Sequence, residues 1–596
     1  MTLGRIFRTV KYLSFEQWFF RGIRYGKQLA RKLMPNLSWR YAELISGRLE
    51  LPNPNSAHVL LISQRVLFSQ LTIDGSQYTN PRLGRFEILN EKFDFGSLKN
   101  VFWRGNFKEG DNPLRRMNLA YMDYMVPLLA NAEPRALELV ATFLKQFEEQ
   151  NNWSQRDVFR DVWNSYSVSH RLINLLAGIS LYNNAGGTCD PAAESQITRH
   201  VRLCASFVYN NLERDIQYNH LLKNYVALAT YSAGLECLPK KFRFLPSAIE
   251  ESLCQIILPD GGHAERSPMY HALGILDIDI LLNSGIFEIP AIKNLTKIRK
   301  KMIRALAIMS HPDGKIALFN DSWLGGSPDV EFFKTPEISS QEILPITGYG
   351  RIGGDDDVVI MDFGPCGPDD NPGHAHADFL SIEASIGKKR FIIDPGVPTY
   401  TAGELRDISR SAANHNGPHL TGVEPIEFWK SFRVGRRGTA WPIFHPQLSC
   451  VAPLWLAGIQ TGYRHVGVKT LRWVGLWPEK AMLICDQWLG INNFDAKTRF
   501  LISGDWKFLS NRDVVFSSQE NSQVRVENLI GRITCTGNAT VWQKFGQELS
   551  AHEIVIEPTV KSESQAAAIW FQWGDVELPT RECLAKLFAT LANLQR

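Results

Sequence analysis

The chain has 596 residues, of which 44% are hydrophobic and 21% are charged, and its net charge is +4. These proportions are those of a soluble globular protein that can bury a large core. No run of about 18 apolar residues occurs, which excludes a conventional membrane-spanning helix. Nine scattered cysteines without a C-x-x-C pair argue against a disulfide framework or a thiolate zinc site. We expect reduced, buried thiols in a reducing compartment, with the cytoplasm as the default.

The charge is concentrated at the N-terminus. Residues 1–40 carry nine lysines or arginines against one acid, Glu16, so this segment is +8 and the remaining chain is −4. Aromatic residues interleave with the basic ones, as in helices that lie on a membrane surface. The alternative is an ordinary helix packed on the domain, and both interpretations stay open. No apolar core with a small-residue cleavage site follows, so we expect no standard secretory signal. The first interpretation places the protein at the inner face of a membrane.

A helical region is predicted from about residue 115 to 312. Apolar residues recur at i, i+3 and i+4 in four segments: 134–151, 170–184, 220–238 and 270–287. Turn-rich breaks separate them. Serial helices of this length favour an α/α toroid or a solenoid, and no clear repeat decides between the two.

After about residue 340 the pattern becomes that of β-strands. Short runs rich in β-branched residues end at Gly, Pro or Asp, at 356–364, 379–387, 389–396, 481–490, 498–506 and 552–558. Such runs are typical of an antiparallel β-sandwich. A turn-rich stretch at 311–333 marks the boundary. We therefore predict three regions: a basic, mixed region at 1–100, a helical domain at 101–335 and a β-sandwich domain at 336–596.

The stretch "NPGHAHADFLSIEASIGKKRFIIDPG" (371–396) carries the first candidate site. On a strand, His374 and His376 would face the same side. Asp394 follows an apolar run and needs a partner if it is buried, and His415 follows in "SAANHN". Two histidines and one aspartate are ligands that Zn²⁺ takes. On spacing alone, a metal site and hydrogen-bonded turn residues both remain open.

Three further motifs lie in the helical half. In "YNHLLKN", Asn219 and His220 stand where a helix begins and Asn224 one turn later, with Asn219 as a simple helix cap as the alternative. "DGGHAERSPMYH" (260–271) is a loop dense in acid-base groups that runs into a helix. Its candidate side chains are His263, Glu265, Arg266, Tyr270 and His271. "WNSYSVSHRLIN" offers Trp163, Tyr166 and Arg171 near another helix start.

Taken together, these motifs and "MNLAYMDY" resemble the heparinase II/III-like family of polysaccharide lyases. The matches run from about residue 117 to 416 in the family's order. The resemblance implies an α+β multidomain protein, with an N-terminal α/α toroid (an incomplete barrel) and a C-terminal antiparallel β-sandwich. It also implies an acidic polysaccharide bound in a cleft and β-elimination at a uronic acid, and surface or exopolysaccharide metabolism is an analogy to proteins of this kind.

Carried onto this sequence, the resemblance assigns individual roles. Asn219 and His220 match the residues that bind the uronate carboxylate and stabilise the developing charge. Tyr270 matches the proton donor to the leaving oxygen, and His374 the second acid/base. The expected substrate-binding residues are Arg171, Trp163, Tyr166, Asn224, Glu265 and Arg266. The expected ligands of a structural Zn²⁺ or other divalent cation are His376, Asp394 and His415, and Asp378 is expected to be a supporting hydrogen-bond partner and not a ligand.

Two features depart from the family pattern. Lys223 stands where many relatives carry Glu, which would reverse the charge beside Asn219 and His220, and no secretory signal is seen. A uronyl C5-epimerase, a non-catalytic glycan-binding scaffold and a metal hydrolase therefore remain alternatives to the lyase. The expected partner is an acidic polysaccharide, with peripheral membrane contact through residues 1–40 and no nucleic acid. The sequence predicts no oligomeric state.

Overall fold

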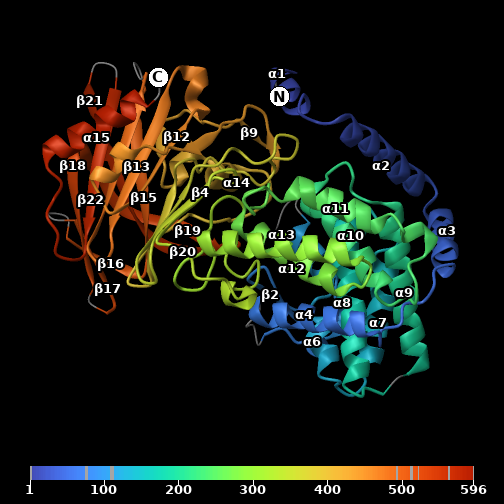
Figure 1. The fold of residues 1–596 in the computed structure, drawn as a ribbon. Coiled ribbons are helices and arrows are strands. Elements are labelled where there is room, and N and C mark those ends of the chain that lie inside the picture. The colour runs from blue at the N-terminus through green and yellow to red at the C-terminus, as the bar shows by residue number, and fades with distance from the viewer. Residues whose placement is uncertain are drawn as a thin grey trace. The chain divides into compact units, whose positions relative to one another are not determined.

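The computed structural model describes residues 3–73, 78–105, 107, 113–188, 190–490, 494–510, 514–520, 522–561 and 564–594. It divides into two compact units. The sandwich unit comprises Met1–Tyr12, Leu258–Ala272 and Lys301–Arg596, and the helical unit comprises Leu13–Ile257 and Leu273–Lys300. This division differs from the three predicted regions because two loop-containing stretches inside the helical half pack with the sheets. Figure 1 shows the elements of both units.

The helical unit is built around α8. This helix contacts α4, α5, α6, α9 and α10, and both α8 and α10 are buried along most of their length. The helices of this half are α2 (Phe15–Leu33), α3 (Pro35–Gly47), α4 (Ala57–Ile73), α5 (Leu114–Tyr121), α6 (Met125–Ala130), α7 (Ala136–Gln150), α8 (Ser165–Asn184), α9 (Pro191–Asn210), α10 (Tyr218–Ser232), α11 (Leu245–Ile256), α12 (Pro268–Asn283) and α13 (Ile289–Ile308). A short hairpin pairs β1 (Arg85–Ile88) with β2 (Glu91–Asp94).

Local sequence signals explain where these helices begin. Asn164 caps α8 by accepting a hydrogen bond from the backbone N–H of Tyr166, and Asp190 does the same for α9 ahead of Pro191. The helix α10 differs, because it starts at Tyr218 directly after Gln217, and both residues have positive φ angles (48° and 65°). Asn219 is therefore inside the first turn and is not the helix cap, so that alternative interpretation was wrong.

The sandwich unit holds two nine-stranded antiparallel sheets. In the first, the order is β19-β20-β15-β7-β6-β5-β4-β3 with β8 paired to β15; in the second it is β11-β12-β13-β14-β22-β18-β17-β16 with β21 paired to β22. The strands of the first sheet are β3 (Gln341–Leu344), β4 (Tyr349–Gly353), β5 (Val358–Asp362), β6 (Ile382–Ile386), β7 (Lys389–Ile392), β8 (Pro418–Leu420), β15 (Ala496–Ser503), β19 (Arg532–Lys544) and β20 (Gln547–Glu557).

Those of the second sheet are β11 (Ala440–Pro442), β12 (Leu454–Gln460), β13 (Lys469–Trp477), β14 (Ala481–Leu489), β16 (Trp506–Ser510), β17 (Val514–Ser518), β18 (Gln523–Ile530), β21 (Thr559–Lys561) and β22 (Ser564–Gln572). Between the sheets, the Phe391 ring lies 5.0 Å from Trp506 and 5.8 Å from Phe571, so aromatic contacts tie the two layers together. Smaller elements are α1 (Leu3–Val10), the β9 (Phe428–Trp429) and β10 (Arg433–Val434) pair, α14 (Glu404–Arg410) and α15 (Arg581–Asn593).

The apolar pattern of the sequence predicted six of the strands and missed others, including the buried β4 and β13. All six strand-like runs correspond to observed strands, and all four helical segments contain an observed helix. The sequence did not indicate β19, an edge strand whose burial pattern is mostly exposed or intermediate. Since neither of its faces is fully covered, no apolar alternation is required there.

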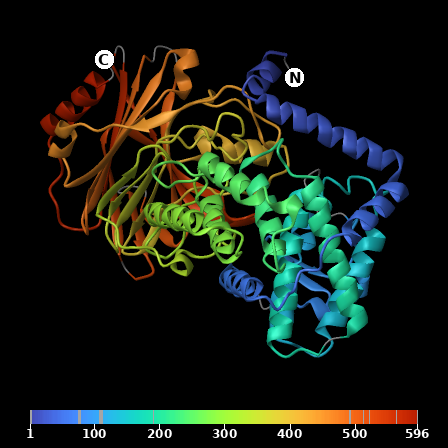
Figure 2. The same cartoon turned by 45° about the vertical axis from the view of Figure 1, so that its right-hand side comes forward.

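Both ends of the described chain pack on the sandwich unit. Arg5 and Arg8 bind Glu427, and the Arg437 guanidinium lies 3.7 Å from the centre of the Tyr12 ring. At the other end, the apolar face of α15 packs with Trp473 and Trp570 of the second sheet, and Figure 2 shows this red helix alongside the strands. The first twelve residues are thus part of a β-sheet unit, which separates α1 from the rest of the basic N-terminal segment.

Two composition-based expectations can be compared with the structure. Among the described residues, no helix is both long and apolar enough to cross a membrane. The thiols are buried at Cys204, Cys366 and Cys485, but three others are exposed, so the prediction of buried cysteines was partly wrong. The exposed ones are Cys237, Cys254 and Cys535.

Candidate functional site

A tyrosine and a histidine stand face to face in the sandwich unit. The ring centroids of Tyr270 and His374 are 4.2 Å apart, and the Tyr400 hydroxyl lies 3.4 Å from the Tyr270 hydroxyl. Ser267 starts α12 by accepting a hydrogen bond from the Tyr270 backbone N–H (3.2 Å), which fixes the tyrosine in the first helical turn. The two predicted acid/base groups are therefore neighbours, although 104 positions separate their numbers.

Asp321, which sequence reasoning missed, organises this pair. Its carboxylate binds His374 Nδ1 (2.9 Å), His376 Nε2 (2.9 Å) and the guanidinium of Arg406 (2.6 and 2.8 Å). Burial alone would raise the pKa of Asp321, but the charge of Arg406 and the hydrogen bonds from both histidines hold it well below its usual value. The carboxylate is thus ionised and can only accept hydrogen bonds.

That constraint fixes the proton positions on both histidines. His374 must carry its proton on Nδ1, which leaves Nε2 as the basic nitrogen. His376 must carry its proton on Nε2, and its buried Nδ1 has no hydrogen-bond partner. Burial lowers the pKa of His376 to about 3, so this ring stays neutral. The carboxylate therefore leaves a different ring nitrogen without a proton on each histidine: Nε2 on His374 and Nδ1 on His376.

The two histidines converge for a reason other than the predicted one. They lie in a loop between β5 and β6, not on a strand, so the strand-alternation argument was wrong. The loop is shaped by Asn320, whose side-chain oxygen accepts from the His376 backbone N–H (2.9 Å). Asp378 in turn accepts from the Asn320 backbone N–H (2.7 Å). Asp378 is thus a supporting residue, as expected.

The predicted metal ligands lie behind this pair. His415 Nδ1 binds Asp394 Oδ2 (2.8 Å), and the His376 and His415 rings are 5.3 Å apart. Asp394 also accepts from the N–H of Gly396 (3.1 Å), whose φ of +72° forms the turn after β7. Burial raises the pKa of Asp394 to about 6.

The donor chemistry of these three residues suits a divalent cation, although they are not gathered around one point. His376 Nδ1 and His415 Nε2 are both buried without a hydrogen-bond partner, and a carboxylate adjoins them. Within the part of the chain that the structure describes, no three His, Cys, Asp or Glu side chains form a group that could hold a metal ion.

Other residues of the 260–271 loop point into the sandwich unit. Arg266 donates to the backbone carbonyls of Thr347 (3.0 Å) and Ala264 (2.9 Å), and Glu265 is buried. His271 Nε2 binds the Met302 carbonyl (2.8 Å). Arg266 and His271 thus hold the loop against its surroundings. These bonds anchor the turn that presents Tyr270.

A second cluster lies in the helical unit around His220. Its Nδ1 is 3.2 Å from Glu213 Oε1, and the Tyr166 ring lies 4.6 Å from the His220 ring. Asn224 is fully buried and fixes Glu213, since it accepts from the Glu213 backbone N–H (2.8 Å) and donates to its carboxylate (3.1 Å). The side-chain oxygen of Asn219 is buried and has no hydrogen-bond partner.

The charge reversal expected from Lys223 does not occur. Lys223 is buried, and its ammonium group donates to the carboxylate of Asp277 on α12. Burial raises the pKa of Asp277, and Lys223 opposes that rise. The pair compensates its own charge inside the helical unit. Lys223 therefore adds no net positive charge beside Asn219 and His220.

The expected substrate-binding role of Arg171 was wrong. The side chain is fully buried, donates to the carbonyls of Ala120 and Val162 (both 3.1 Å), and lies over the Phe147 ring (4.4 Å). Trp163 is also buried, with its ring N–H donating to the Asn151 carbonyl (3.0 Å). A polysaccharide cannot reach a guanidinium enclosed in the core, so Arg171 holds the α8 region together.

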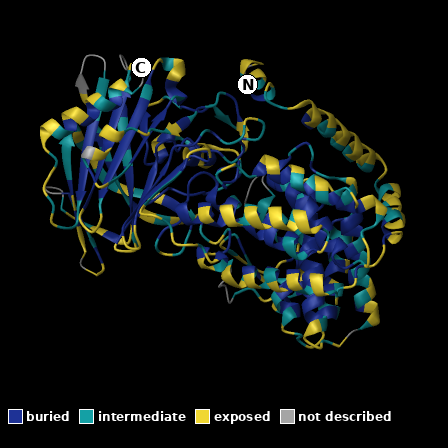
Figure 3. Ribbon diagram, in the orientation of Figure 1, coloured by how far each residue is buried: buried dark blue, intermediate teal, exposed yellow. Residues whose placement is uncertain are grey.

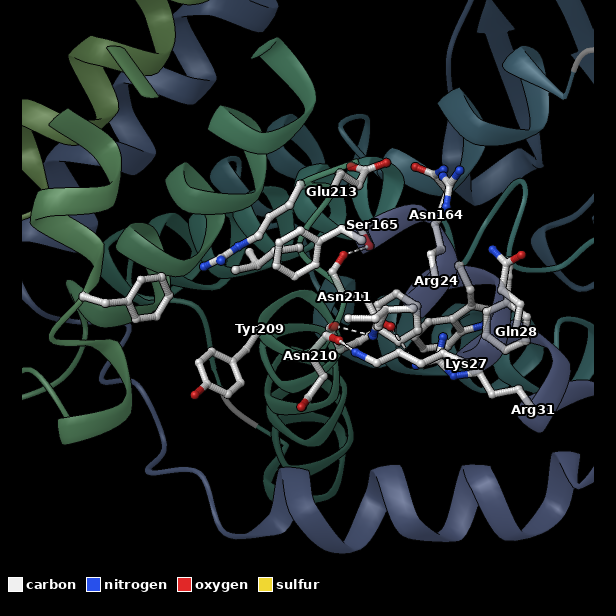
Figure 4. A pocket seen from close by; sticks show the side chains of 18 residues that line it. Arg24, Lys27, Gln28, Arg31, Asn164, Ser165, Tyr209, Asn210, Asn211 and Glu213 are labelled. Atoms are coloured by element: carbon white, nitrogen blue, oxygen red, sulfur yellow. Dashed lines mark hydrogen bonds between the residues drawn. The ribbon is translucent and has the colours of Figure 1, made fainter. Parts of the chain in front are cut away.

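A cavity of about 370 Å³ opens within the helical unit (Figure 4). Basic residues of α2, the start of α8 and the end of α9 line it. Glu213, the partner of His220, lies at its edge. This cavity was not predicted, because its wall combines residues that are more than a hundred positions apart.

The fold is that of a helical toroid followed by an antiparallel β-sandwich, and in the sandwich unit the Tyr270 ring contacts His374, which is bound by the buried carboxylate of Asp321. Residues 340–571 match the family model described as heparinase II/III-like, C-terminal. The family that the sequence motifs resemble is thereby confirmed. No curated protein sequence matches the chain.

Solved structures confirm the predicted fold along most of the chain. A heparinase III is similar at a TM-score of 0.65 and 15% identity, covering 89% of this chain and 87% of its own. A mutant of the heparan sulfate lyase HepC from Pedobacter heparinus is similar at 0.56 and 16%, covering 91% and 88%. The structural neighbours are thus polysaccharide lyases by name, and at these identities the likeness shows the shared fold.

Glu424 makes the stability of the sandwich unit depend on pH. Its carboxylate accepts from the Ala412 backbone N–H (3.0 Å), next to the segment that carries His415. Burial raises the pKa of Glu424 from 4.5 to about 7. The folded protein therefore binds this proton more tightly than the unfolded chain does, and stability is lost as pH rises from about 4.5 through 7.

Glu424→Gln should remove that loss. We expect equal unfolding free energies for the variant and the natural protein near pH 4.5. Above pH 7 the variant should be more stable by roughly 3–3.5 kcal/mol, because the pKa rises from 4.5 to about 7 and each pKa unit corresponds to about 1.4 kcal/mol. Urea unfolding followed between pH 4.5 and 8 measures this. Glu548→Gln, at an exposed position of β20, is the control that should leave the profile unchanged. A constant difference across the pH range would contradict the assignment.

Proposed function

We propose that the protein is a lyase that cleaves a uronic-acid-containing polysaccharide by β-elimination. The observation that carries this proposal is the Tyr270–His374 pair, held at 4.2 Å in the unit that matches the heparinase II/III-like family. Several structural neighbours are named as heparan sulfate lyase or heparinase, which supports an acidic glycan as the substrate. A surface polysaccharide or exopolysaccharide is the context we propose.

The reaction requires the removal of a weakly acidic proton. The C5–H of a uronate becomes acidic only when the charge of its carboxylate is compensated. Asn219 and His220 fill this role in the proposal, with Glu213 orienting His220. The side-chain amide nitrogen of Asn219 would donate to the carboxylate, and its buried oxygen, which has no hydrogen-bond partner, would accept from a hydroxyl group of the substrate. The compensated Lys223–Asp277 pair adds no net charge beside Asn219 and His220.

The sandwich unit supplies the proton transfers. The free Nε2 of His374 takes the C5 proton, and the C5–H electrons form the C4–C5 double bond as the C4–O bond breaks. Tyr270 gives its phenolic proton to the departing O4. Burial raises the pKa of Tyr400 well above its usual value, so its hydroxyl stays protonated and can donate to the Tyr270 oxygen. The C5 proton thus goes to His374, the electron pair goes to the new C4–C5 double bond, and the leaving oxygen takes its proton from Tyr270.

Tyr270→Phe should lower kcat by about 10²–10⁴, the usual contribution of a positioned proton donor. The assay follows the ultraviolet absorbance of the unsaturated product from heparan, chondroitin and alginate. Tyr41→Phe, at an exposed position of α3, should retain full activity. An undiminished rate in Tyr270→Phe would contradict the mechanism. Deuterium incorporation at C5 without absorbance would instead identify an epimerase.

We further propose that His376, Asp394 and His415, which are not gathered around one point in this structure, close around a structural divalent cation when it binds, with Zn²⁺ the best match to their donor atoms. The two buried nitrogens without partners support this. The ion would link the β5–β6 loop to the segment after β7, where it would add stability. No catalytic step depends on it.

Elemental analysis of the purified protein should find about one zinc per chain. His415→Gln should lose it and unfold at a lower temperature, because the nitrogen ligand is removed. His465→Gln, at an exposed position, is the matched control and should keep its metal. A metal-free natural protein that gains no stability from added zinc would exclude the ion.

We also propose that α2 and α3 contact a membrane surface. Figure 3 shows the outer face of α2 as largely exposed. Its exposed apolar residues recur at helical spacing along one side. They are Phe15, Trp18, Phe19, Ile23, Tyr25, Leu29 and Leu33. Exposed Lys32 borders this side and complements anionic lipid headgroups. Leu37, Tyr41 and Leu44 continue the surface along α3.

Vesicle flotation tests this contact. The natural protein should float with vesicles of phosphatidylcholine and phosphatidylglycerol, and less with phosphatidylcholine alone. Phe19→Glu should reduce binding by at least about tenfold, because burial of such a side chain contributes roughly 1.5–3 kcal/mol. Phe68→Glu, on the exposed side of α4, is the matched control. Self-association of the natural protein that Phe19→Glu abolishes, without vesicle binding, would show a protein interface instead.

A further inference from the structure

The inner side of α2 forms one wall of the cavity in the helical unit. Arg24, Lys27 and Arg31 project from this side together with Phe20 and Ile23, while most of the exposed apolar residues of the helix lie on the opposite side. Figure 4 shows these cations around the same space as Asn210 and Asn211 at the end of α9. A helix that packs on a protein normally buries its apolar side. In α2 the cationic side faces the body of the unit.

Each of these cations has a protein partner but retains hydrogen-bonding capacity. Lys27 Nζ donates to the Asn210 carbonyl (2.5 Å), and Arg31 donates to the side-chain oxygen of Asn211 (2.8 Å). An ammonium group has three donors and a guanidinium has five. Arg24 pairs with Asp215 (2.8 Å), yet its buried Nε–H has no hydrogen-bond partner. Donors without partners remain beside the cavity.

The local electrostatics favour an anion. Burial lowers the pKa of Arg31 to about 10, and burial together with the charge of Arg31 lowers the pKa of Lys27. Both shifts mean that the charged forms are less stable here than in water. A bound anion would stabilise them. Glu213 is the acidic residue of the lining, and it already binds His220 and Asn224.

Aromatic rings form the apolar part of the lining. The Arg31 guanidinium lies 5.0 Å from the Phe159 ring and 5.2 Å from the Phe207 ring, and these two rings are stacked. Trp163 and Phe244 complete the apolar surface. Flat apolar rings beside charge donors suit a sugar ring, which has C–H faces and polar edges. The volume of about 370 Å³ is in the range of small-molecule sites, about 300–1,000 Å³.

We infer that this cavity binds an acidic sugar, carrying a carboxylate or a sulfate, whose anionic group contacts Lys27 and Arg31. The inference deepens the proposed function, on which its substrate class rests. Glu213 connects the cavity to the residues proposed to bind the uronate carboxylate, because it lines one and holds His220 in the other. A sugar in the cavity would therefore be part of the same glycan chain, next to the reacting unit.

Two lysines on α2 provide a matched test. Lys27 lines the cavity, and Lys32 is exposed on the same helix outside it. Binding is measured by calorimetry in the Tyr270→Phe background, so that no turnover occurs. The probes are a uronate oligosaccharide, its sulfated form, its carboxyl-reduced neutral form and inorganic sulfate. Lys27→Gln should weaken binding of the acidic oligosaccharides by about tenfold or more, since a charged hydrogen bond is worth roughly 1.5–3 kcal/mol. Lys32→Gln should not.

A conservative variant and a kinetic measurement distinguish lost sugar binding from a folding defect. Lys27→Arg should restore binding, which a folding defect would not allow. In the otherwise natural enzyme, Lys27→Gln should raise KM and leave kcat nearly unchanged. Equal binding by Lys27→Gln and Lys32→Gln would overturn the inference, as would binding of inorganic sulfate with no gain from the sugar. Saccharide binding without any elimination product would support the cavity while contradicting the proposed lyase activity.

Discussion

The candidate site of the sandwich unit depends on one buried carboxylate. Asp321 accepts hydrogen bonds from His374 and His376 and a paired interaction from Arg406, and all of these groups are largely buried. An isolated charge at such a position would be costly, so the arginine and the carboxylate require each other. Because the carboxylate stays ionised, both imidazoles must direct a proton toward it. The free nitrogens that remain set the chemistry of each ring.

Short-range patterns predicted much of this structure. The helices around Arg171 and Asn224 and the strands that flank His374 follow from apolar periodicity, which is strongest where an element is buried. Tyr270 and His374 were identified by motif, and the structure places them together. Asp378 was expected to support the loop, and it does so through Asn320. Local sequence patterns thus predicted these helices and strands, and the motifs identified Tyr270 and His374.

Partners distant in sequence could not be predicted in this way. Asp321 and Arg406 lie outside the quoted motifs, and only tertiary packing brings them to the histidines. The stretch "FNDSW" contains Asn320 and Asp321, but no spacing rule links them to two histidines more than fifty positions away. The prediction of a substrate-binding role for Arg171 was wrong for the opposite reason. The motif around Arg171 matched, but a single sequence does not show that the side chain is buried. Burial, not residue type, decided its role.

Lys223 and Asp277 also constrain how this sequence can change. They form one neutral unit inside the helical unit, although they stand on different helices. Restoring the family's Glu at position 223 alone would place two carboxylates together in a buried space, where one would have to take up a proton. Replacing Asp277 alone would leave a buried ammonium group without its counter-charge. The two positions can therefore be exchanged only as a pair. The charge that residue 223 brings to the helical unit can be judged only together with that of residue 277.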